Sequence, residues 1–485
     1  MPERHEVLSE SLSENVDRFR DLLNAGVNAD AHFRDYMAGA VPICVIYIEG
    51  MASDGKINDF VLRAVATHPS GAMDLEALRD RVLEIAQCDD ERRVDAILRA
   101  VVTGMTAVLM EGCDRALLLE TRGFPARQVD KTTNESVVLG SQEGFVECLR
   151  TNITLLRRYV PSHRLVTESL TVGSAVPCQL SLVYLEGVTD PKIVDELRQR
   201  VQRIDASSVR GIGELMQRIE DKPAALLPQL LQTERPDRAA ACLLDGQAVL
   251  LADNSPYALA APVSLFHLLH ASDDSFARWQ YGTLLRVIRF MGMLISVFLP
   301  GLYIALTDYH MHLIPMNLLT SIAEARSGVP FPILAEILMM EFSFYLINEA
   351  GTRMPRQIGG ALGIVGALIL GQAAVSASII SPILIIIVAL TGLGNYAVPD
   401  YGFGLGLILY RLAILLAGAL FGLYGICIAA FCIVTSLCAM RSLGMPFLAP
   451  IAPPRPHDPD ILLRLPPWFQ KKAMRFTAVN RDLSG

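Results

Sequence analysis

Residues 41–58 read VPICVIYIEGMASDGKIN, and residues 176–194 read VPCQLSLVYLEGVTDPKIV. In both stretches a β-branched apolar run ends in a Glu-Gly pair, at Glu49-Gly50 and at Glu186-Gly187. A short run of this kind that ends in a glycine turn predicts a strand. The two copies lie about 135 residues apart, and this repetition of one pattern indicates an internal duplication.

A second pair of stretches extends the repeat. Residues 107–119, AVLMEGCDRALLL, match residues 241–251, ACLLDGQAVLL, so that Glu111-Gly112 falls on Asp245-Gly246. We expect each of these stretches to form two short strands joined by a glycine turn. The acidic residues in these pairs could serve acid catalysis, but a turn at the end of a strand is the simpler interpretation.

The repeat predicts two tandem α/β subdomains. We place the first at 31–140 and the second at 141–280, after an N-terminal extension at 1–30. Helical patterns such as DLEALRDRVLEIA and PKIVDELRQRVQRI follow the first strands of the two copies. A helical linker at about 141–160 is expected to open the second subdomain.

The remainder of the chain is strongly apolar. The 485 residues are 52% hydrophobic and 19% charged, with a mean hydropathy of +0.38 and a net charge of −8. These values exclude a disordered chain and a strongly basic nucleic-acid-binding protein. Apolar stretches near the ~20-residue length of a bilayer span follow one another from Val287 to Met440. We therefore predict a polytopic transmembrane helical domain of about five to six helices at 281–440, and a cytoplasmic Pro/Arg-rich tail at 441–485.

Apolar segments in this domain are expected at about 287–307, 329–348, 358–377, 379–398 and 405–440. Arg286 and Arg289 lie at the start of the first segment, which by the positive-inside rule places the N-terminal part in the cytoplasm. The basic tail is expected on the same side, so the number of crossings should be even. Either the last segment crosses twice, or one of the broken segments is re-entrant.

Proline and glycine interrupt these segments, at Pro330, Pro332, Gly351, Pro355, Pro382 and Pro399. Irregular backbone at membrane depth is tolerated where protein or a water-filled cavity satisfies it. Transporters and channels use such breaks to present backbone dipoles to ions. Close helix packing through small residues, as at Gly418 and Gly422, is the alternative explanation, and the two are compatible.

Polar and ionisable side chains within the apolar segments form a candidate ion pathway: Glu336, Glu341, Glu349, Gln372 and Arg411. A charge in the hydrocarbon core is costly and usually faces a pathway or a partner. For Glu336 and Glu349, the alternative is a position near the membrane surface, where water solvates the carboxylate. No nucleophile–base pair, metal-ligand cluster or phosphate-binding motif stands out, so we expect no enzyme, no cofactor, and no catalytic or metal-binding residue.

Several stretches together resemble the A subunits of bacterial spore germinant receptors. They are TERPD (233–237), SPYALAAP (255–262), LPGLYIALTDYH (299–310), SIAEARSGVPFP (321–332), NEAGTRMP (348–355) and GIVGALILGQAAVSASIISP (363–382). The same family includes SpoVAF, a paralogue encoded in the stage V sporulation A operon. The resemblance covers roughly 140–450 and is weaker in the first subdomain.

The resemblance implies an integral protein of the inner spore membrane with its N-terminal domain in the cytoplasm. It implies contact with membrane lipid, self-association, and assembly with germinant receptor B and C subunits, without a nucleic-acid partner. The implied function is a contribution to a nutrient-gated, cation-releasing channel that starts germination. The alternatives are a SpoVAF-like or non-conducting member that organises germination complexes, and a secondary transporter, for which no inverted repeat is visible.

The chain departs from the family pattern at four membrane positions. Tyr345 and Ser376 stand where family members usually have glutamate, and Asn348 and Ile408 stand where they usually have arginine. Two acidic and two basic charges are therefore replaced together. Loss of both signs indicates the removal of ion pairs, because a lone buried charge would be penalised. This difference favours the non-conducting alternative.

Overall fold

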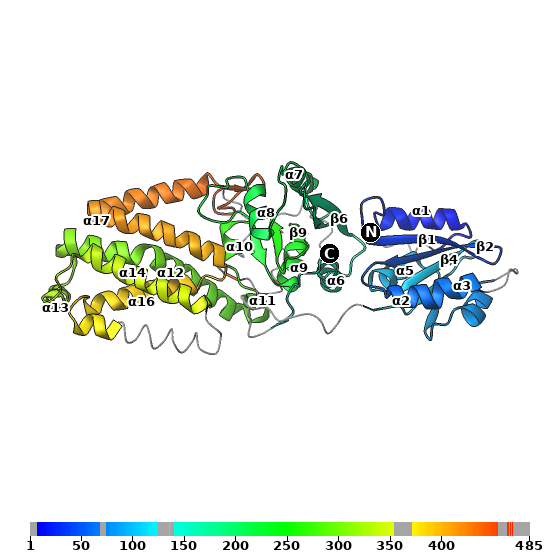
Figure 1. Ribbon diagram of the computed structural model, residues 1–485, viewed down its shortest axis with the longest axis horizontal. Coiled ribbons are helices and arrows are strands. Elements are labelled where there is room, and N and C mark those ends of the chain that lie inside the picture. The colour runs from blue at the N-terminus through cyan, green and yellow to red at the C-terminus, as the bar shows by residue number, and fades with distance from the viewer. Residues whose placement is uncertain are drawn as a thin grey trace.

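The computed structural model describes residues 7–67, 74–123, 135, 140–353, 371–453, 463, 464, 466 and 468. Along the long axis of the molecule, the first α/β subdomain, the second and the helical part follow in sequence order (Figure 1). The predicted break at Pro355 and most of the predicted segment at 358–377 lie outside the described residues.

The first subdomain is a five-stranded antiparallel sheet with helices on both faces. Its strands lie in the order β1 (Ala31–Ala38), β2 (Val41–Ile48), β4 (Thr106–Met110), β5 (Ala116–Leu119) and β3 (Cys88–Glu91). Its helices are α1 (Leu12–Leu22), α2 (Asp54–Ile57), a π-helical turn (Asn58–Leu62), α3 (Arg63–Thr67), α4 (Leu75–Ala77), a second π-helical turn (Leu78–Val82) and α5 (Val94–Val102). Side chains of β2 alternate between the faces, so that Ile46 packs with α1 and α5 whereas Val45 packs on the opposite side.

Helix α1 lies in the region expected to be an N-terminal extension, and this expectation is wrong for residues 12–22. Val16 and Phe19 of α1 are buried in the core of the first sheet. The carboxylate of Glu111 accepts the backbone N–H of Leu12 at 2.9 Å and so satisfies one of the free donors at the start of the helix. A helix this short needs such tertiary contacts to be stable.

The second subdomain repeats the first. Its strands lie in the order β6 (Leu165–Val172), β7 (Cys178–Leu185), β9 (Ala248–Ala252), β10 (Ala258–Ala261) and β8 (Leu231–Thr233), again with antiparallel pairing. Its helices are α6 (Leu149–Tyr159), α7 (Pro191–Gln202), α8 (Ile212–Ile219), α9 (Pro236–Leu244), α10 (Leu265–Leu269) and α11 (Asp273–Phe276). The equivalent strands occupy equivalent places in both sheets, as the first repeated motif predicts.

A buried asparagine marks the same position in both copies. The side chain of Asn15 accepts the backbone N–H of Ser9 at 3.0 Å and donates to the Ser9 carbonyl at 2.6 Å. Asn152 makes the same two bonds with Val146, at 2.8 Å and 2.6 Å. Helices α1 and α6 are therefore equivalent, and each asparagine ties its helix to the chain that enters it.

The second pair of repeated stretches is aligned wrongly by the sequence. Residues 107–119 form β4 and β5 as expected, but Cys242–Leu244 end helix α9 and are not a strand. Gly246 (φ 85°) follows the last turn of α9, as Gly104 (φ 98°) follows α5. An apolar run before Asp-Gly fits a strand end and a helix end equally well, because both use a left-handed glycine.

The helical part begins with α12 (Trp279–Ile304), which continues as a π-helical turn (Ala305–Tyr309). It continues with a 3₁₀ turn (Met311–Leu313), α13 (Met316–Arg326), α14 (Ile333–Arg353), α16 (Pro382–Tyr396) and α17 (Tyr401–Cys438), then the short strands β11 (Arg441–Ser442) and β12 (Met445–Pro446). Within the described residues, two helical stretches are long and apolar enough to span a membrane, Trp279–Tyr309 and Tyr401–Cys438. Helix α16 is apolar but shorter.

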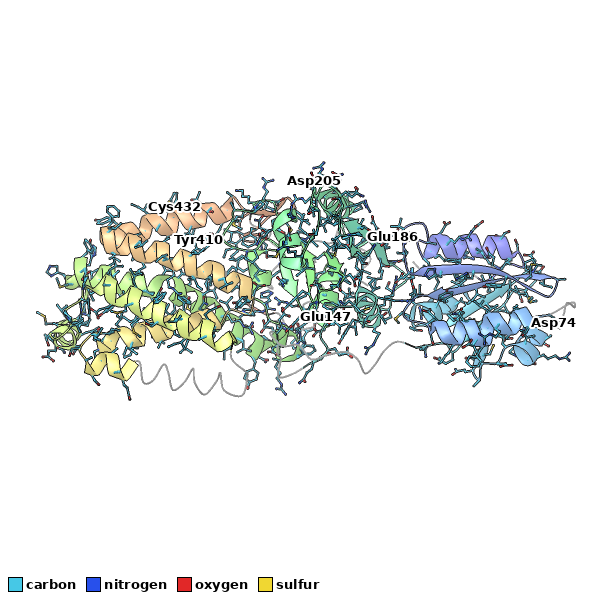
Figure 2. The ribbon with its side chains drawn as sticks, in the orientation of Figure 1. Asp74, Glu147, Glu186, Asp205, Tyr410 and Cys432 are labelled. Carbon is cyan, nitrogen blue, oxygen red and sulfur yellow. The ribbon has the colours of Figure 1, made fainter. Side chains whose placement is uncertain are left out.

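Helix α17 is a hairpin. Gly422 interrupts it with φ 60° and ψ −144°, a backbone conformation that glycine adopts without strain. Gly406 of the first arm lies against the Leu226 carbonyl, and Lys222 donates to the Ala439 carbonyl at the end of the second arm. The first arm therefore begins at the second subdomain and the second arm ends there, as Figure 1 shows. Figure 2 labels Tyr410 on the first arm and Cys432 on the second. A helical hairpin of this kind is the geometry required if the last apolar segment is to cross twice.

Helix α12 packs against its neighbours through backbone contacts. A Cβ atom at Gly394 of α16 would lie 2.4 Å from the Gly292 carbonyl oxygen, and one at Gly418 of α17 would lie 2.8 Å from the Gly301 carbonyl oxygen. A side chain at either position would separate the helices. Small residues thus have a packing role here, as the close-packing explanation predicts for Gly418. Gly422 instead forms the turn of the hairpin.

The second subdomain and the helical part share one hydrophobic core. Val249 of the second sheet, Val297 of α12 and Phe403 of α17 belong to one continuous apolar cluster, together with Phe447 after the last helix. The hydroxyl of Ser442 accepts the Val263 N–H at 3.0 Å and donates to the Gln229 carbonyl at 2.6 Å. The first residues of the expected tail are therefore fixed to the second subdomain.

The first subdomain contacts the second through polar groups. Arg157 of α6 is buried and donates to both carboxylate oxygens of Asp30 at 2.5 Å and to the Asn28 side chain at 3.1 Å. Asn24 donates to Glu186 at 2.6 Å, and Figure 2 shows Glu186 at the boundary of the two subdomains. Among the described residues, no apolar cluster joins the first subdomain to the rest.

We expect Arg157→Ala to lower the free energy of unfolding by about 3–5 kcal/mol, because Asp30 would be left as a buried charge without its partner. Arg20→Ala is the matched control. Arg20 occupies the equivalent place on α1, but its side chain is 46% exposed and 3.7 Å from Asp17, so its loss should cost at most about 1 kcal/mol. Thermal and urea unfolding of the two variants measure the difference, and equal losses would contradict the assignment.

Candidate functional site

The predicted pathway residues Glu341 and Arg411 form a buried ion pair in the helical part. Nε of Arg411 lies 3.1 Å from a carboxylate oxygen of Glu341, and the two residues are 1% and 8% exposed. They belong to α17 and α14, two elements that the sequence separates widely. A charge in apolar surroundings is tolerated when it has a partner of opposite sign, so the pair links the two helices.

Two further groups stabilise Arg411. The ring of Tyr345 on α14 lies 5.4 Å from the guanidinium carbon, a distance suited to a cation–π contact. The hydroxyl of Ser296 on α12 accepts a hydrogen bond from Arg411 at 3.3 Å. Ser296 lies one turn before Pro300, which cannot donate to its carbonyl oxygen. Arg411 thus joins α12, α14 and α17.

Glu336 forms a second buried pair, nearer the start of α14. Its carboxylate accepts hydrogen bonds from Arg326 and from the Ser381 backbone N–H, both at 3.1 Å, and the residue is 1% exposed. Arg326 was not among the sequence candidates, although it ends the stretch SIAEAR just before the Pro330 break. Glu336 is not solvated at a surface, which was the alternative explanation for this residue.

The other two pathway candidates lie on the outside of the helical part. Glu349 near the end of α14 is exposed, and so is Gln372. Asn348 beside Glu349 is also exposed and accepts a hydrogen bond from the Tyr396 hydroxyl at 2.7 Å. The structure therefore divides the five candidates into a buried, paired set (Glu336, Glu341 and Arg411) and an exposed set (Glu349 and Gln372).

The predicted breaks fall mostly between helices. Pro330 and Pro332 separate α13 from α14, Pro382 is the first residue of α16, and Pro399 separates α16 from α17. Gly351 is an exception, because it lies inside α14 and does not interrupt it. A further proline, Pro300, lies inside α12.

The motif TERPD forms a polar junction at the base of the helical part. Arg235 is buried and donates to both carboxylate oxygens of Asp237 and to the carbonyls of Glu135 and Ser141. Arg238 donates to the Glu135 carboxylate at 3.1 Å and to the carbonyls of α10 and its end, at His267 and His270. Burial raises the pKa of Glu135. The junction connects the chain before α6 to the segment that leads into α12.

The start of α12 is held by Asp274. This carboxylate is 1% exposed and lies 3.4 Å from Nε of Arg286 and 2.7 Å from Nη1 of Arg289. These are the two arginines on which the expected orientation of the first segment rests. Their positive charges therefore also fix the helix to α11 of the second subdomain.

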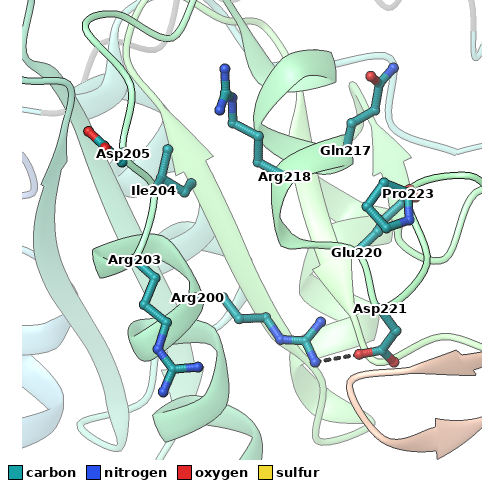
Figure 3. Close-up of a pocket in the computed structure, with 9 residues that line it drawn as sticks. All are labelled: Arg200, Arg203, Ile204, Asp205, Gln217, Arg218, Glu220, Asp221 and Pro223. Atoms are coloured by element: carbon teal, nitrogen blue, oxygen red, sulfur yellow. Dashed lines mark hydrogen bonds and ion pairs between the residues drawn. The ribbon is translucent and has the colours of Figure 1, made fainter.

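A cavity of about 510 Å³ lies beside the ends of α7 and α8 (Figure 3). Its wall contains arginines and carboxylates in equal number, namely Arg200, Arg203, Arg218, Asp205, Glu220 and Asp221. Arg200 pairs with Asp221, as the dashed line in Figure 3 marks, and Asp221 also accepts the Gly444 N–H at 3.2 Å. The cavity wall is thus bonded to the chain that follows the last helix.

The fold and the buried pairs define a class of protein: a tandem α/β part joined through one hydrophobic core to apolar helices that contain paired charges. The family model described as Bacillus/Clostridium GerA spore germination protein matches residues 17–476. The chain belongs to the GerA spore germination protein family.

Individual relatives support this assignment over nearly the whole chain. Spore germination protein KA of Bacillus subtilis (strain 168) is 33% identical over 476 residues, 97% of this chain and 87% of the relative. GerLA of Bacillus cereus is 35% identical over 92% of this chain and 91% of the relative. An uncharacterized membrane protein of B. subtilis, YfkQ, is 34% identical over 95% and 90%. The family resemblance inferred from the sequence motifs is confirmed.

A solved structure also matches the N-terminal part. It is the N-terminal domain of the A subunit of the Bacillus megaterium spore germinant receptor GerK3, with 23% identity and a TM-score of 0.42. The match covers 53% of this chain and 96% of that domain.

We expect Glu341→Gln to destabilise the helical part by about 3–5 kcal/mol, because Arg411 would remain as a buried charge without its partner. Replacing both residues, in Glu341→Leu with Arg411→Met, should recover most of this loss. The protein level in membranes and the unfolding temperature in detergent measure both effects. A double variant that is less stable than Glu341→Gln would contradict the pairing.

Acid should weaken the junction at the base of the helices through His267. Burial, with the charges of Arg238 and Arg286, lowers the pKa of His267 from its usual 6.5 to about 4. Between pH 4 and pH 6.5, His267 binds a proton in the unfolded chain but not in the folded one. The free energy of unfolding therefore decreases by about 3 kcal/mol as the pH falls from 6.5 to 4.

His267→Gln can keep the capping contact with Ser264. It should reduce the slope of the unfolding free energy against pH by up to the contribution of one bound proton. Urea unfolding between pH 4 and 7 measures the slope. His312→Gln, at an exposed position, is the control. The same slope in wild type and His267→Gln would contradict the prediction.

Proposed function

We propose that the chain is a membrane subunit of a spore germinant receptor and contributes to a nutrient-gated channel that releases monovalent cations. Family membership supports a role in spore germination. The family resemblance implies the role of a receptor A subunit, and we extend that role to this chain. In this proposal, the chain assembles with itself and with B and C subunits, as the family resemblance implies.

In this proposal, residues 281–440 cross the inner spore membrane as a polytopic helical domain. Residues 31–140, 141–280 and the tail at 441–485 lie on the cytoplasmic side. Counting the last of the five expected segments as two, because α17 is a hairpin, makes six crossings. An even number keeps the α/β part and the tail on one side, as their basic residues require.

One observation carries the conducting role: polar and ionisable side chains lie on the outside of the helical part. Glu349 and Gln372 are exposed there, although such residues avoid lipid. Contact with a second copy, or with water between copies, would shield these exposed polar side chains from lipid. A pathway between subunits therefore suits these two exposed residues, whereas Glu341 and Arg411 are buried among the helices.

The non-conducting alternative, a SpoVAF-like member that organises germination complexes, is supported by the surroundings of Arg411. Tyr345, where the resemblance expects a glutamate, covers the guanidinium with an aromatic ring. Arg411 is thereby held by a single carboxylate, one ring and one hydroxyl. A protein of this kind should assemble with its partner subunits but pass no current after purification. Within the part of the chain that the structure describes, no feature specifically favours a secondary transporter.

Spores that carry this chain with its cognate B and C subunits provide the test. Glu349→Gln should slow cation release about fivefold at an unchanged protein level, because one carboxylate within about 4 Å of a cation in water contributes about 1 kcal/mol. Glu341→Gln, on the same helix, is the matched control and should lower the protein level instead. Wild-type release in both Glu349→Gln and Gln372→Leu would favour the non-conducting alternative.

A further inference from the structure

We propose that Glu336 is a binding site for a monovalent cation, and that Arg326 occupies this site as a tethered substitute for the cation. The site lies toward the end of the helical part that is distant from the α/β subdomains, where α13 lies in Figure 1. This inference deepens the proposed cation-release function and rests on it.

The carboxylate of Glu336 lies where a negative charge needs a partner. The residue is 1% exposed, and its neighbours on α14, Ile333 and Ile337, belong to an apolar cluster with Leu384 of α16. One carboxylate oxygen accepts the Ser381 N–H, at the N-terminus of α16, whose dipole compensates part of the charge. The other oxygen lies 3.1 Å from Arg326, the one positive group that pairs with it among the described residues.

Two hydroxyl groups make the site rich in oxygen. The hydroxyls of Tyr303 and Ser381 are buried, on residues that are 8% and 1% exposed, and neither makes a hydrogen bond within the described part of the chain. Tyr303 packs in the same apolar cluster as Ile337 and Ile380, which are the chain neighbours of Glu336 and Ser381. A carboxylate with neutral oxygens beside it is the ligand set that hard cations prefer.

The backbone beside the site is irregular in a way that suits an ion. Between residue 376 and α16 the chain leaves the helical conformation, and Ser378 has a φ of 54°. Carbonyl groups in such an interruption are not used by a helix. Interrupted helices in transporters coordinate sodium ions with carbonyls of this kind.

Few contacts hold Arg326 and its helix in place, so the side chain can move away from Glu336. It ends α13, an 11-residue helix in which Ile322 is the one buried residue. Met316 and Leu318 of the same helix are 72% and 52% exposed. The Arg326 side chain itself is 24% exposed, in contrast to 1% for Glu336. The guanidinium can therefore withdraw with α13 while α12, α14 and α16 keep their packing.

The experiment uses the purified full-length chain in detergent and compares unfolding temperatures in potassium chloride and in N-methylglucamine chloride of equal ionic strength. Wild type should show no difference between the two salts, because Arg326 fills the site. Arg326→Gln should unfold about 2–4 °C higher in saturating potassium, as expected for a ligand at about ten times its Kd. Arg326→Met, which keeps the bulk of the side chain, should behave in the same way.

The control is Arg326→Gln combined with Glu336→Gln, which should lose the potassium effect. A potassium effect of equal size in the double variant, or none in both single variants, would overturn the proposal in favour of a purely structural ion pair. Failure of both single variants to accumulate in potassium, while the double variant accumulates, would also overturn it.

This assay detects binding and requires neither conduction nor partner subunits. A chain that binds potassium at Glu336 but fails the spore test with Glu349→Gln would contradict the proposed conducting role and leave this site standing. A chain that passes the spore test but shows no potassium effect would contradict this site alone.

Discussion

A buried guanidinium next to a carboxylate is the interaction on which the rest of this structure depends. Arg157 lies against Asp30 between the α/β subdomains, and Arg411 lies against Glu341 among the helices. In each case the partners come from distant parts of the chain. A charge withdrawn from water needs a partner of opposite sign. Each pair therefore fixes the relative positions of elements that neither secondary structure nor chain connection would fix.

The interface between the second subdomain and the helices is apolar, whereas the interface between the two subdomains is polar. The second subdomain, α12 and α17 share one apolar core, so their relative arrangement is held by packing over a wide area. The first subdomain is joined to the second by hydrogen bonds and ion pairs in which Asn24, Asp30 and Arg157 take part. Polar contacts can be exchanged for contacts with water, whereas a shared core cannot be opened without exposing apolar surface. A conformational change that begins in the second subdomain would therefore reach the helices through continuous apolar packing.

The glycine and proline residues of the helical part serve two purposes, close helix packing and interruption of the helices. Gly292, Gly301, Gly394 and Gly418 let α12 approach its neighbours, which is a packing role. Pro330, Pro332 and Pro382 lie at interruptions beside Glu336, where backbone and carboxylate meet. Packing and exposure of backbone groups thus occur in the same helices, but at different positions.

The first repeated motif predicted the fold of the α/β part well, because strand–turn patterns are local and a duplication shows them twice. The second motif was aligned wrongly, since the run before Asp245-Gly246 is a helix end whose local pattern equals that of a strand end. Helix α1 was expected to be an extension, because its role depends on contacts with Glu111 and the distant β4. The family was evident from motifs in the second subdomain and the helices, and the comparisons confirm it.

The sequence by itself determined the tandem α/β repeat, the apolar second half of the chain and the presence of charges within it. Local pattern, composition and periodicity carry that information. Only the tertiary structure decided which charges are paired, because Glu341 meets Arg411 and Glu336 meets Arg326 through the packing of separate helices. It also decided that Glu349 and Gln372 lie outside and that α17 turns back at Gly422. A charge has a cost that depends on its surroundings, and those surroundings exist only once the helices are packed.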